Sequence, residues 1–530
     1  MPDRRLSFGE IEAASRLLAR RLLRAGVGKG TRVGLHLPYG PDVVTAYLAV
    51  GRIGAIVMPF STALSPPEMR QALRAGDVHL LITIPRLLGA DESAFLEEVV
   101  PELEGRGAGP HYLSGLPRLR DVWMLGGAER RWARAVRVGE AVPVGEVLPA
   151  GEVLPAGEVP EDPGVDEALL EAAEADVAPA DWLVVIHTSG TSAEPKGVVH
   201  THGAVFGKTA RGFQVAVGEG QAAPRIFAAM PFFWVGGLIT LATALHQGAT
   251  LVCLERFQPD AALDLIERER VSVLSAWHGL VTALQNHPSV PRRDLSCIPM
   301  LTTQGFGGGQ FLAPLGMTET LGPHLELTHP VYGGELPYEL RGSNGSSGPY
   351  FDHKLVDPVT GAVLGNGDEG ELCVRGYAVA EGIYKRERHE VFDNDGYYHT
   401  GDQCRVRDGL YFFTGRTTEM IKTRGANVAP AEVEAALLQN PSVGQAFVFG
   451  VPDAEREEAV AAVVVPADGG SLDRARLTEQ LSARLARYKV PTTIVSMVED
   501  ELPLLPTGKV DKRALQRGFE PSAAPAGGRR

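Results

Sequence analysis

Helix-type and strand-type segments alternate along the chain from its first residues to about residue 415. Ile11, Leu18 and Leu22 fall on one face of a helix, and residues 31–37 follow as a strand. Residues 43–60 predict a second helix and then a buried strand. Alternation of this kind is typical of α/β folds, in which helices cover a largely parallel sheet. We therefore expect a large, multi-layer α/β domain in the N-terminal part of the chain.

A change of pattern near Gly415 divides the chain into two parts. Pro430 stands where the first turn of a helix is expected, and apolar segments at residues 446–451 and 459–465 predict strands. This second part predicts a small α+β domain of roughly a hundred residues, which is an ordinary domain size. Proline, alanine and glycine dominate the end of the sequence, and we expect residues 517–530 to form a disordered tail.

Residues 144–159 contain a tandem repeat, in which the unit GEVLPA begins at Gly145 and again at Gly151. Proline and glycine recur every few residues and prevent a regular helix or strand. We expect a flexible surface insertion, because loops tolerate added residues better than core elements do.

The bulk composition excludes several classes of protein. A chain of 530 residues exceeds one compact core, and 44% hydrophobic with 22% charged residues is ordinary for a soluble globular protein. The net charge of −14, from 51 basic and 65 acidic residues, argues against nucleic acid as a partner, because such binding needs clustered cations. The four cysteines form no CxxC pair, and no segment predicts a signal peptide or a membrane span, so we expect a cytoplasmic protein.

The segment HTSGTSAEPKG, residues 187–197, directly follows an apolar strand at residues 182–186. It contains four hydroxyl side chains, two glycines and Lys196. Hydroxyl groups, backbone N–H groups exposed by glycine and an ammonium group all donate hydrogen bonds to phosphate oxygens. The segment therefore predicts an anion-binding loop, and a solvated surface turn is the alternative that these residues alone leave open.

Six further segments carry recognisable patterns in a fixed order along nearly the whole chain. They are MPFFWVGGL (residues 230–238), GMTET (316–320), GELCVRG (370–376), YHTGD (398–402), GRTTEMIKTRGANVAPAEVE (415–434) and PTGKVDKRAL (506–515). With the loop at residues 187–197 they resemble the adenylate-forming superfamily, which includes acyl-CoA synthetases, luciferases and peptide-synthetase adenylation domains. The acyl-CoA synthetase branch, whose members are AMP-dependent CoA ligases, matches best, through GVGKGTRVGLHLP near the start and LPTGKVDKRAL near the end.

The resemblance implies two domains. Residues 1–416 would form the N-terminal domain that binds AMP and the acyl group, and residues 417–516 a mobile C-terminal domain that carries the catalytic lysine. The mobile domain would swing as a rigid body about a hinge at Thr418. The implied activity is that of an AMP-forming ligase, which uses ATP, Mg²⁺ and CoA to convert a carboxylic acid to a thioester.

The implied reaction has two steps. The acid attacks the α-phosphate of ATP and releases pyrophosphate, and a thiol then displaces AMP. The first step brings two anions into contact, and cations must offset their repulsion. Lys509 matches the lysine that bridges these anions in the family, Glu319 matches the Mg²⁺ ligand, and Thr318 would bind the α-phosphate. In the second step Lys422 would take the place of Lys509.

The resemblance implies further contacts in three groups. The residues for ATP or AMP are Thr188, Ser189, Gly190, Thr191, Lys196, Gly316, Met317, Thr318, Asp402, Arg416 and Lys509, of which Asp402 and Arg416 would bind the ribose. The residues for CoA are Lys422, Thr423, Arg424 and Gly425. The acyl-pocket residues are Phe232, Phe233, Trp234, Gly237, Trp277, His278 and Gly279, a set that indicates a roomy apolar pocket for a hydrophobic acid.

Four features depart from the family pattern. Thr418 replaces a usual hinge aspartate or lysine, Trp234 replaces a common histidine, and Leu315 replaces a tyrosine that stacks on adenine. Residues 301–320 leave no room for the helix and strand that usually precede GMTE. These departures support a second hypothesis, in which the enzyme accepts an acyl-adenylate made by a separate adenylating enzyme and has weak or no adenylation activity.

Two other functions stay open at this level. An acyl-AMP ligase would load a carrier protein in place of CoA. A non-catalytic binding protein on the same scaffold is disfavoured, because Glu319, Asp402, Arg416 and Lys509 are all intact. The identity of the acid is not predicted.

Overall fold

The structure is a computed structural model, and it divides the chain into two compact units. The first unit comprises residues 1–324, 349–351 and 376–394, and the second comprises residues 325–348, 352–375 and 395–530. The repeat at residues 144–159 and residues 520–530 of the predicted tail lie outside the described residues, and the domain boundary at residue 416 stays a prediction. The structure describes residues 4–136, 167–188, 196–212, 223–276, 278–298, 301, 315–326, 340, 342–348, 350–416, 421–423, 426–428, 430–453, 457–467, 472–482, 484–485, 488–504 and 510–519.

The described part of the first unit contains an eight-stranded sheet in the order β20-β9-β8-β2-β1-β3-β6-β7. The strands from β8 to β7 are parallel. At one edge, β9 pairs antiparallel with β8, and β20 pairs antiparallel with β9. The bounds are β1 Arg32–Leu35, β2 Ile56–Pro59, β3 Leu80–Thr83, β6 Asp121–Leu125, β7 Arg134–Val136, β8 Trp182–Thr188, β9 Lys196–Thr201 and β20 Gly382–Ile383.

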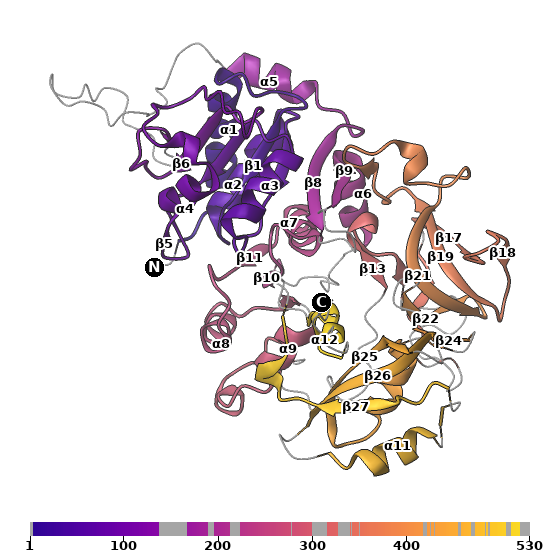
Figure 1. Ribbon diagram of the computed structural model, residues 1–530. Coiled ribbons are helices and arrows are strands. Elements are labelled where there is room, and N and C mark those ends of the chain that lie inside the picture. The colour runs from indigo at the N-terminus through magenta and orange to yellow at the C-terminus, as the bar shows by residue number, and fades with distance from the viewer. Residues whose placement is uncertain are drawn as a thin grey trace, which may run out of the picture. The chain divides into compact units, whose positions relative to one another are not determined.

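Helices cover this sheet, as Figure 1 shows for the indigo and purple part of the chain. Helix α1 packs on α2 and α5, and α3 packs on α4. Every residue of β2, β3 and β6 is buried, as expected for parallel strands covered on both faces. The bounds are α1 Phe8–Arg24, α2 Pro41–Arg52, α3 Pro66–Ala75, α4 Glu92–Val99, α5 Glu167–Ala175 and α6 His202–Gly212, with a short hairpin of β4 Arg86–Leu87 and β5 Ala90–Asp91.

Local chemistry explains where the first helices begin. Ser7 caps α1 through a capping box: the Glu10 backbone N–H donates to the Ser7 hydroxyl over 3.2 Å, and the Ser7 N–H donates to the Glu10 carboxylate over 2.7 Å. Leu18 and Leu22 are fully buried, which confirms the predicted apolar face. Pro41 opens α2, where the missing N–H of proline costs nothing. The predicted helix and strand in residues 43–60 are therefore present as α2 and β2.

A smaller parallel sheet in the first unit has the order β11-β10-β12. Phe227, Leu263, Ile266 and Leu284 form part of its core with the neighbouring helices. The chain then enters a two-stranded hairpin of β13 and β14. The bounds are β10 Arg225–Ala228, α7 Val235–Gln247, β11 Thr250–Val252, α8 Pro259–Arg268, β12 Val273–Ser275, α9 His278–Gln285, β13 Gly316–Met317 and β14 Gly322–Pro323.

The second unit contains a seven-stranded sheet in the order β15-β16-β22-β21-β19-β17-β18 among its described residues. In this sheet, β21 pairs with both β22 and β19, and both ladders are antiparallel. The bounds are β15 Leu325–Glu326, β16 Gly345–Ser347, β17 Phe351–Val356, β18 Val363–Leu364, β19 Glu369–Gly376, β21 Tyr398–Arg407 and β22 Leu410–Arg416.

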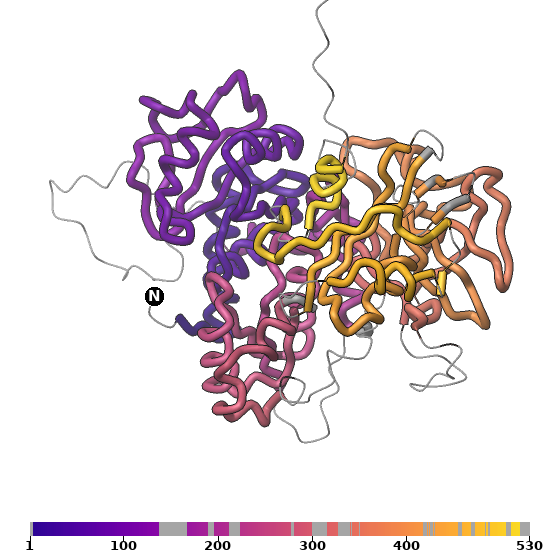
Figure 2. Tube along the Cα trace, turned by 60° about the horizontal axis from the view of Figure 1, so that its bottom comes forward, coloured from indigo at the N-terminus to yellow at the C-terminus, as the bar shows by residue number. Residues whose placement is uncertain are grey.

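The C-terminal part of the second unit, coloured orange to yellow in Figure 2, forms a separate five-stranded sheet within the described residues, in which β25 and β26 are a long antiparallel pair. Val433, Leu437, Val448 and Leu477 share its core, so the predicted α+β character is confirmed. The bounds are β23 Ile421–Thr423, β24 Ala426–Val428, α10 Pro430–Leu438, β25 Val443–Asp453, β26 Glu457–Pro466, α11 Arg474–Ser482, β27 Thr493–Ser496 and α12 Lys512–Arg517. Among the helices that the structure describes, none combines the length and the apolar character that crossing a membrane requires.

Candidate active site

The hairpin of β8 and β9 carries the two ends of the predicted anion-binding loop. Residues 183–186 are buried, which explains why this apolar run forms a strand inside the sheet. Thr188 lies opposite Lys196 in the antiparallel register, and its hydroxyl donates to the Lys196 carbonyl oxygen over 3.4 Å. The predicted loop residues that fall outside the described part of the chain are Ser189, Gly190 and Thr191.

Lys196 forms an ion pair with Glu319, between the ammonium nitrogen and Oε1 of the carboxylate. The Lys196 side chain is 30% exposed and the Glu319 side chain 9%, so the pair is largely sheltered. A sheltered carboxylate is costly unless it is paired, and Lys196 supplies the partner. The structure thus brings together the predicted phosphate-loop lysine and the predicted Mg²⁺ ligand. The ammonium group of Lys196 is suited to phosphate oxygens, and the carboxylate of Glu319 is suited to a divalent metal ion bound to those phosphates.

Glu319 lies on a tight turn between β13 and β14. Thr318–Thr320 form a single 3-10 turn, and Leu321 and Gly322 follow with φ angles of 51° and 80°. A Cβ atom on Gly316 would lie 2.6 Å from the backbone of Gly322, so glycine is needed for the two strands to approach. This turn leaves Glu319, backbone and side chain together, only 7% exposed.

Lys208 on α6 binds the end of the same turn. Its ammonium group donates to the carbonyl oxygens of Thr320 at 2.7 Å, Leu321 at 2.9 Å and Pro323 at 2.6 Å. The lysine is only 3% exposed, and burial lowers its pKa to about 7. Three hydrogen bonds satisfy all three N–H donors of the ammonium group, which stabilises the protonated form in this apolar setting.

His200 on β9 binds the start of the turn. Its Nε2 atom lies 2.7 Å from the carbonyl oxygen of Thr318. A carbonyl oxygen only accepts, so Nε2 carries the proton. Burial lowers the pKa of His200 to about 4, so the ring is neutral near pH 7. The turn is thus held at three points: Lys196 pairs with Glu319, His200 binds the beginning of the turn, and Lys208 binds its end.

Asp402 and Arg416, the predicted ribose pair, face each other across β21 and β22 in the second unit. Arg416 Nε lies 2.9 Å from Asp402 Oδ1. Asp402 is 2% exposed, whereas the side chain of Arg416 is 46% exposed. The buried carboxylate is therefore paired with a cation that is itself partly exposed to solvent.

The part of β21 just before Asp402, where the pairing register with β19 shifts, is attached to β19 by hydrogen bonds. The Thr400 hydroxyl donates to the carbonyl oxygen of Leu372 over 2.6 Å and accepts from the Asp402 N–H over 3.0 Å. The Gly401 N–H donates to Glu371 Oε1 over 3.0 Å. Gly401 has φ of 72°, a conformation that glycine adopts at little cost. These contacts set the position from which the Asp402 carboxylate projects.

Comparison with known proteins identifies the family. Residues 1–384 match the AMP-binding enzyme family, and residues 432–509 match the AMP-binding enzyme C-terminal domain. The chain is an AMP-binding enzyme. Within the adenylate-forming superfamily it belongs to the acyl-CoA synthetase branch, and its class is that of the AMP-forming acid–CoA ligases.

Relatives match this AMP-binding enzyme over nearly its whole length. A feruloyl-CoA synthase of an Amycolatopsis species is 30% identical, with 97% of this chain and 94% of the relative covered. An indoleacetate–CoA ligase of Aromatoleum aromaticum is 29% identical, with 96% and 92% covered. The crystal structure of ATP-bound MatB from Rhodopseudomonas palustris superposes with a TM-score of 0.73 at 22% identity, over 98% of this chain and 94% of that one, and it confirms the fold.

The structure describes the predicted CoA-binding residues and part of the predicted acyl-pocket residues only incompletely. Thr423 ends β23 and is buried at 2% exposure. Lys422 and His278 belong to described elements, but their side chains are outside the description. The predicted residues outside the described part of the chain are Trp277, Thr418, Arg424, Gly425 and Lys509. Their roles stay predictions.

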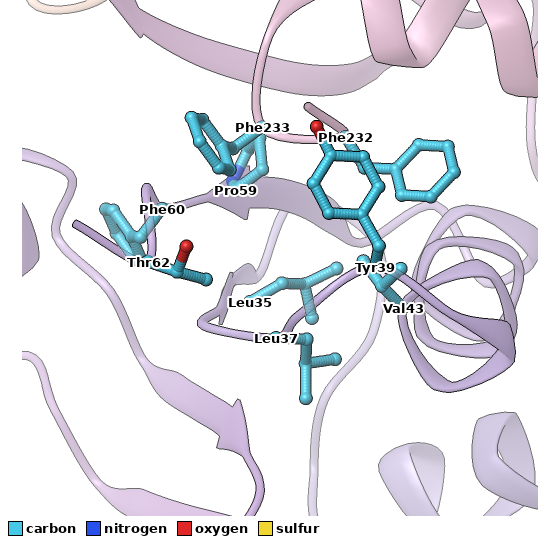
Figure 3. A pocket seen from close by; sticks show the side chains of 9 residues that line it. All are labelled: Leu35, Leu37, Tyr39, Val43, Pro59, Phe60, Thr62, Phe232 and Phe233. Atoms are coloured by element: carbon cyan, nitrogen blue, oxygen red, sulfur yellow. The ribbon is translucent and has the colours of Figure 1, made fainter. Parts of the chain in front are cut away.

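Two described residues of the predicted acyl set line a small cavity. Phe232 and Phe233 line it together with Leu35, Tyr39 and Phe60, as Figure 3 shows. The cavity volume of about 10 Å³ accommodates the centre of one water molecule. This cavity is therefore too small to hold a hydrophobic acid as it stands.

Two residues of the predicted acyl set have clear packing roles. Trp234 lies just before α7, and its ring meets that of Phe233 edge-on with centroids 6.0 Å apart. A Cβ atom on Gly237 would overlap the carbonyl oxygen of Pro231. Glycine at this position lets α7 lie directly against the preceding loop, and this constraint exists without any ligand.

Sequence reasoning missed His200 and Lys208. Neither residue belongs to a segment that resembles the family, and a lysine inside a helical segment ordinarily predicts an exposed side chain. Their acceptors lie more than a hundred residues further along the chain. The residue pattern around His200 or Lys208 therefore contains no information about a hydrogen bond to a segment so far along the chain.

Proposed function

We propose that this AMP-binding enzyme converts a hydrophobic carboxylic acid to its CoA thioester through an acyl-adenylate. The observation that supports this proposal is the ion pair between Lys196 and Glu319. Glu319 lies on the same turn as Thr318. It combines a cation for phosphate oxygens with a carboxylate for a metal ion. We also propose that the reaction takes place in the cytoplasm, which agrees with the four free cysteines.

In the first step, a carboxylate oxygen of the acid attacks the α-phosphorus of ATP. The bond from that phosphorus to the bridging oxygen breaks, and pyrophosphate leaves. Two unit charges about 4 Å apart repel by roughly 4 kcal/mol at a protein surface, so the site needs compensating cations. Lys196 would bind the outer phosphates, and Lys509 would lie between the carboxylate and the α-phosphate. Glu319 would hold Mg²⁺, which supplies additional positive charge to the departing pyrophosphate.

In the second step, the CoA thiolate attacks the acyl carbon, and AMP leaves with the oxygen that joined them. Asp402 and Arg416 would keep the ribose in place through both steps, because they bind a part of the nucleotide that does not react. The segment from Lys422 to Gly425 would then face the pantetheine chain, after the C-terminal domain has turned about Thr418.

Pyrophosphate release tests the first half-reaction. The purified chain is incubated with ATP, Mg²⁺ and a panel of acids that includes ferulate, indoleacetate and a long-chain fatty acid. We expect acid-dependent release of pyrophosphate and formation of the CoA thioester with at least one acid. Formation of thioester from synthetic acyl-AMP and CoA, with no pyrophosphate from ATP, would instead support the enzyme that accepts a preformed adenylate.

A carrier protein as acceptor is the remaining catalytic alternative. Replacing CoA by a carrier protein with its phosphopantetheine arm, at equal thiol concentration, separates the two acceptors. Faster transfer to the carrier than to CoA would support the acyl-AMP ligase. Absence of turnover in every combination, including synthetic acyl-AMP with CoA, would refute the proposed function.

A further inference from the structure

Strands β19 and β21 place three different metal-binding side chains together in the second unit. Glu371 and Cys373 are two residues apart on β19, and alternation along a strand directs such residues to the same face. His399 on β21 is the register partner of Cys373. The carboxylate, the thiol and the imidazole therefore meet on one face of the sheet.

The donor atoms of this cluster are separated by distances that a small cation could bridge. His399 Nδ1 lies 2.9 Å from Glu371 Oε2 and 3.5 Å from Cys373 Sγ. All three donor atoms lie within 4.8 Å of one another. Bonds of tetrahedral zinc to oxygen, nitrogen and sulfur place the donor atoms roughly 3.3–3.6 Å apart. Movements of a few tenths of an ångström for these two pairs, and of at most about one for the third pair, would bring the set to that geometry.

We propose that Glu371, Cys373 and His399 bind a thiophilic divalent cation of the zinc type. A mixed set of sulfur, nitrogen and oxygen donors suits Zn²⁺ or Co²⁺, whereas Mg²⁺ and Ca²⁺ prefer oxygen donors alone. Three protein ligands leave the fourth tetrahedral position to a water molecule. None of the three side chains takes part in the proposed chemical steps, although Glu371 also accepts the hydrogen bond from Gly401 that precedes Asp402.

Exposure and hydrogen bonding fit this assignment. The His399 side chain is 44% exposed and that of Glu371 is 14% exposed, so a cation has access from solvent. Cys373 is buried, which favours a cation that binds sulfur strongly. His399 Nδ1 carries at most one proton and can donate to only one of its two neighbours. One cation would bond to all three groups. Glu371 Oε1 already accepts from the Gly401 N–H, which orients the carboxylate for a metal ion on Oε2.

Cobalt titration tests the site without relying on activity. The full chain, purified without a polyhistidine tag and with its thiols reduced, is titrated with Co²⁺ under argon while the absorption spectrum is recorded. We expect the visible bands of tetrahedral cobalt and a near-ultraviolet band from charge transfer between thiolate and cobalt. One equivalent of Zn²⁺ should abolish both, because zinc displaces cobalt from such sites.

Three variants separate this site from binding elsewhere. C373S should lose the near-ultraviolet band, and H399Q should weaken cobalt binding about tenfold or more. H399Q alters a partly exposed side chain, so it also serves if C373S fails to fold. C404S is the matched control, because Cys404 is an equally buried cysteine on β21 outside the cluster, and it should retain the band.

Three outcomes would overturn the proposal. The first is the absence of cobalt bands at millimolar Co²⁺ in a folded chain. The second is a charge-transfer band that persists in C373S or disappears in C404S. The third is cobalt binding without any thiolate band, which would indicate surface carboxylates only. Circular dichroism of each variant establishes that the chain is folded.

Discussion

The ammonium nitrogen of Lys208 lies 2.7 Å from the carbonyl oxygen of Thr320, one residue after the carboxylate that we expect to hold Mg²⁺. Two more carbonyl oxygens of the same turn share this lysine. A buried cation that ends a turn in this way makes the position of Glu319 depend on a helix that follows the phosphate loop. Stability and metal use should therefore be linked in this enzyme.

The variant K208M tests that link. Methionine fills a similar volume, but it leaves three buried carbonyl oxygens without this donor. An unsatisfied buried group lowers the unfolding free energy by about 1–3 kcal/mol. We expect a loss of that size in urea unfolding, and a higher Mg²⁺ concentration for half-maximal pyrophosphate release. K29M, which alters an exposed lysine, is the control and should change the unfolding free energy by less than about 1 kcal/mol. Unchanged stability and unchanged Mg²⁺ dependence in K208M would contradict the prediction.

His200 should make the enzyme sensitive to acid. Burial lowers its pKa to about 4 in the folded chain, whereas an exposed histidine has a pKa near 6.5. Between these values the unfolded chain binds a proton that the folded chain does not, so stability falls as the pH drops from about 6.5 to about 4. The full contribution is about 3 kcal/mol.

The variant H200Q measures this contribution. Glutamine keeps a donor for the Thr318 carbonyl oxygen but does not titrate, so the unfolding free energy should fall less steeply below about pH 6.5. H389Q, at an exposed histidine, is the control and should keep the pH dependence of the original chain. An H200Q profile parallel to that of the original chain would show that His200 contributes nothing.

The variant E319Q should affect the two half-reactions unequally. Loss of the carboxylate removes the proposed Mg²⁺ ligand together with the ion pair to Lys196. We expect pyrophosphate release to fall about 10²–10³-fold, the usual cost of removing one electrostatic contact to the reacting groups. Thioester formation from synthetic acyl-AMP should fall much less, because pyrophosphate is absent from that step. E381Q, at an exposed glutamate, should retain both rates. Equal losses in the two half-reactions would refute the assignment of Glu319 to the phosphate side.

The variant D402N should weaken AMP binding. The substituted amide would keep the shape of the aspartate side chain but lose its charge, and hydrogen bonds to a charged group contribute about 1.5–3 kcal/mol. We expect the dissociation constant for AMP, measured by calorimetry, to rise roughly ten- to a hundredfold. Asp408 lies in an exposed turn of the same sheet, so D408N should bind AMP normally. Wild-type affinity in D402N would remove Asp402 from the ribose site.

The elements that the sequence predicted well are those whose evidence is local. Leu18 and Leu22 repeat with the period of a helix, and the helix is present as α1. Pro430 opens α10 at the predicted residue. Thr188 and Lys196 lie opposite each other at the ends of the predicted loop, because the apolar run before it could only form a buried strand. Composition and period suffice for elements of this kind.

Contacts between distant segments could not be predicted in the same way. The pairing of Cys373 with His399 depends on the register of β19 and β21, which shifts between Glu371 and Cys373. A shift of one residue would move His399 to the other face of the sheet. The acceptors of Lys208 are backbone carbonyl groups, which every residue possesses, so no residue type in the sequence marks them.

The position of Gly237 against the Pro231 carbonyl oxygen limits how the substrate range of this enzyme can be altered. Any side chain added at Gly237 would displace the start of α7 before it reshaped a pocket. Most members of a mutant library at this position would therefore misfold. Phe233 and Trp234 have no such backbone constraint, and both are partly exposed. Directed evolution toward larger or smaller acids should therefore randomise those two aromatic positions and leave the glycine untouched.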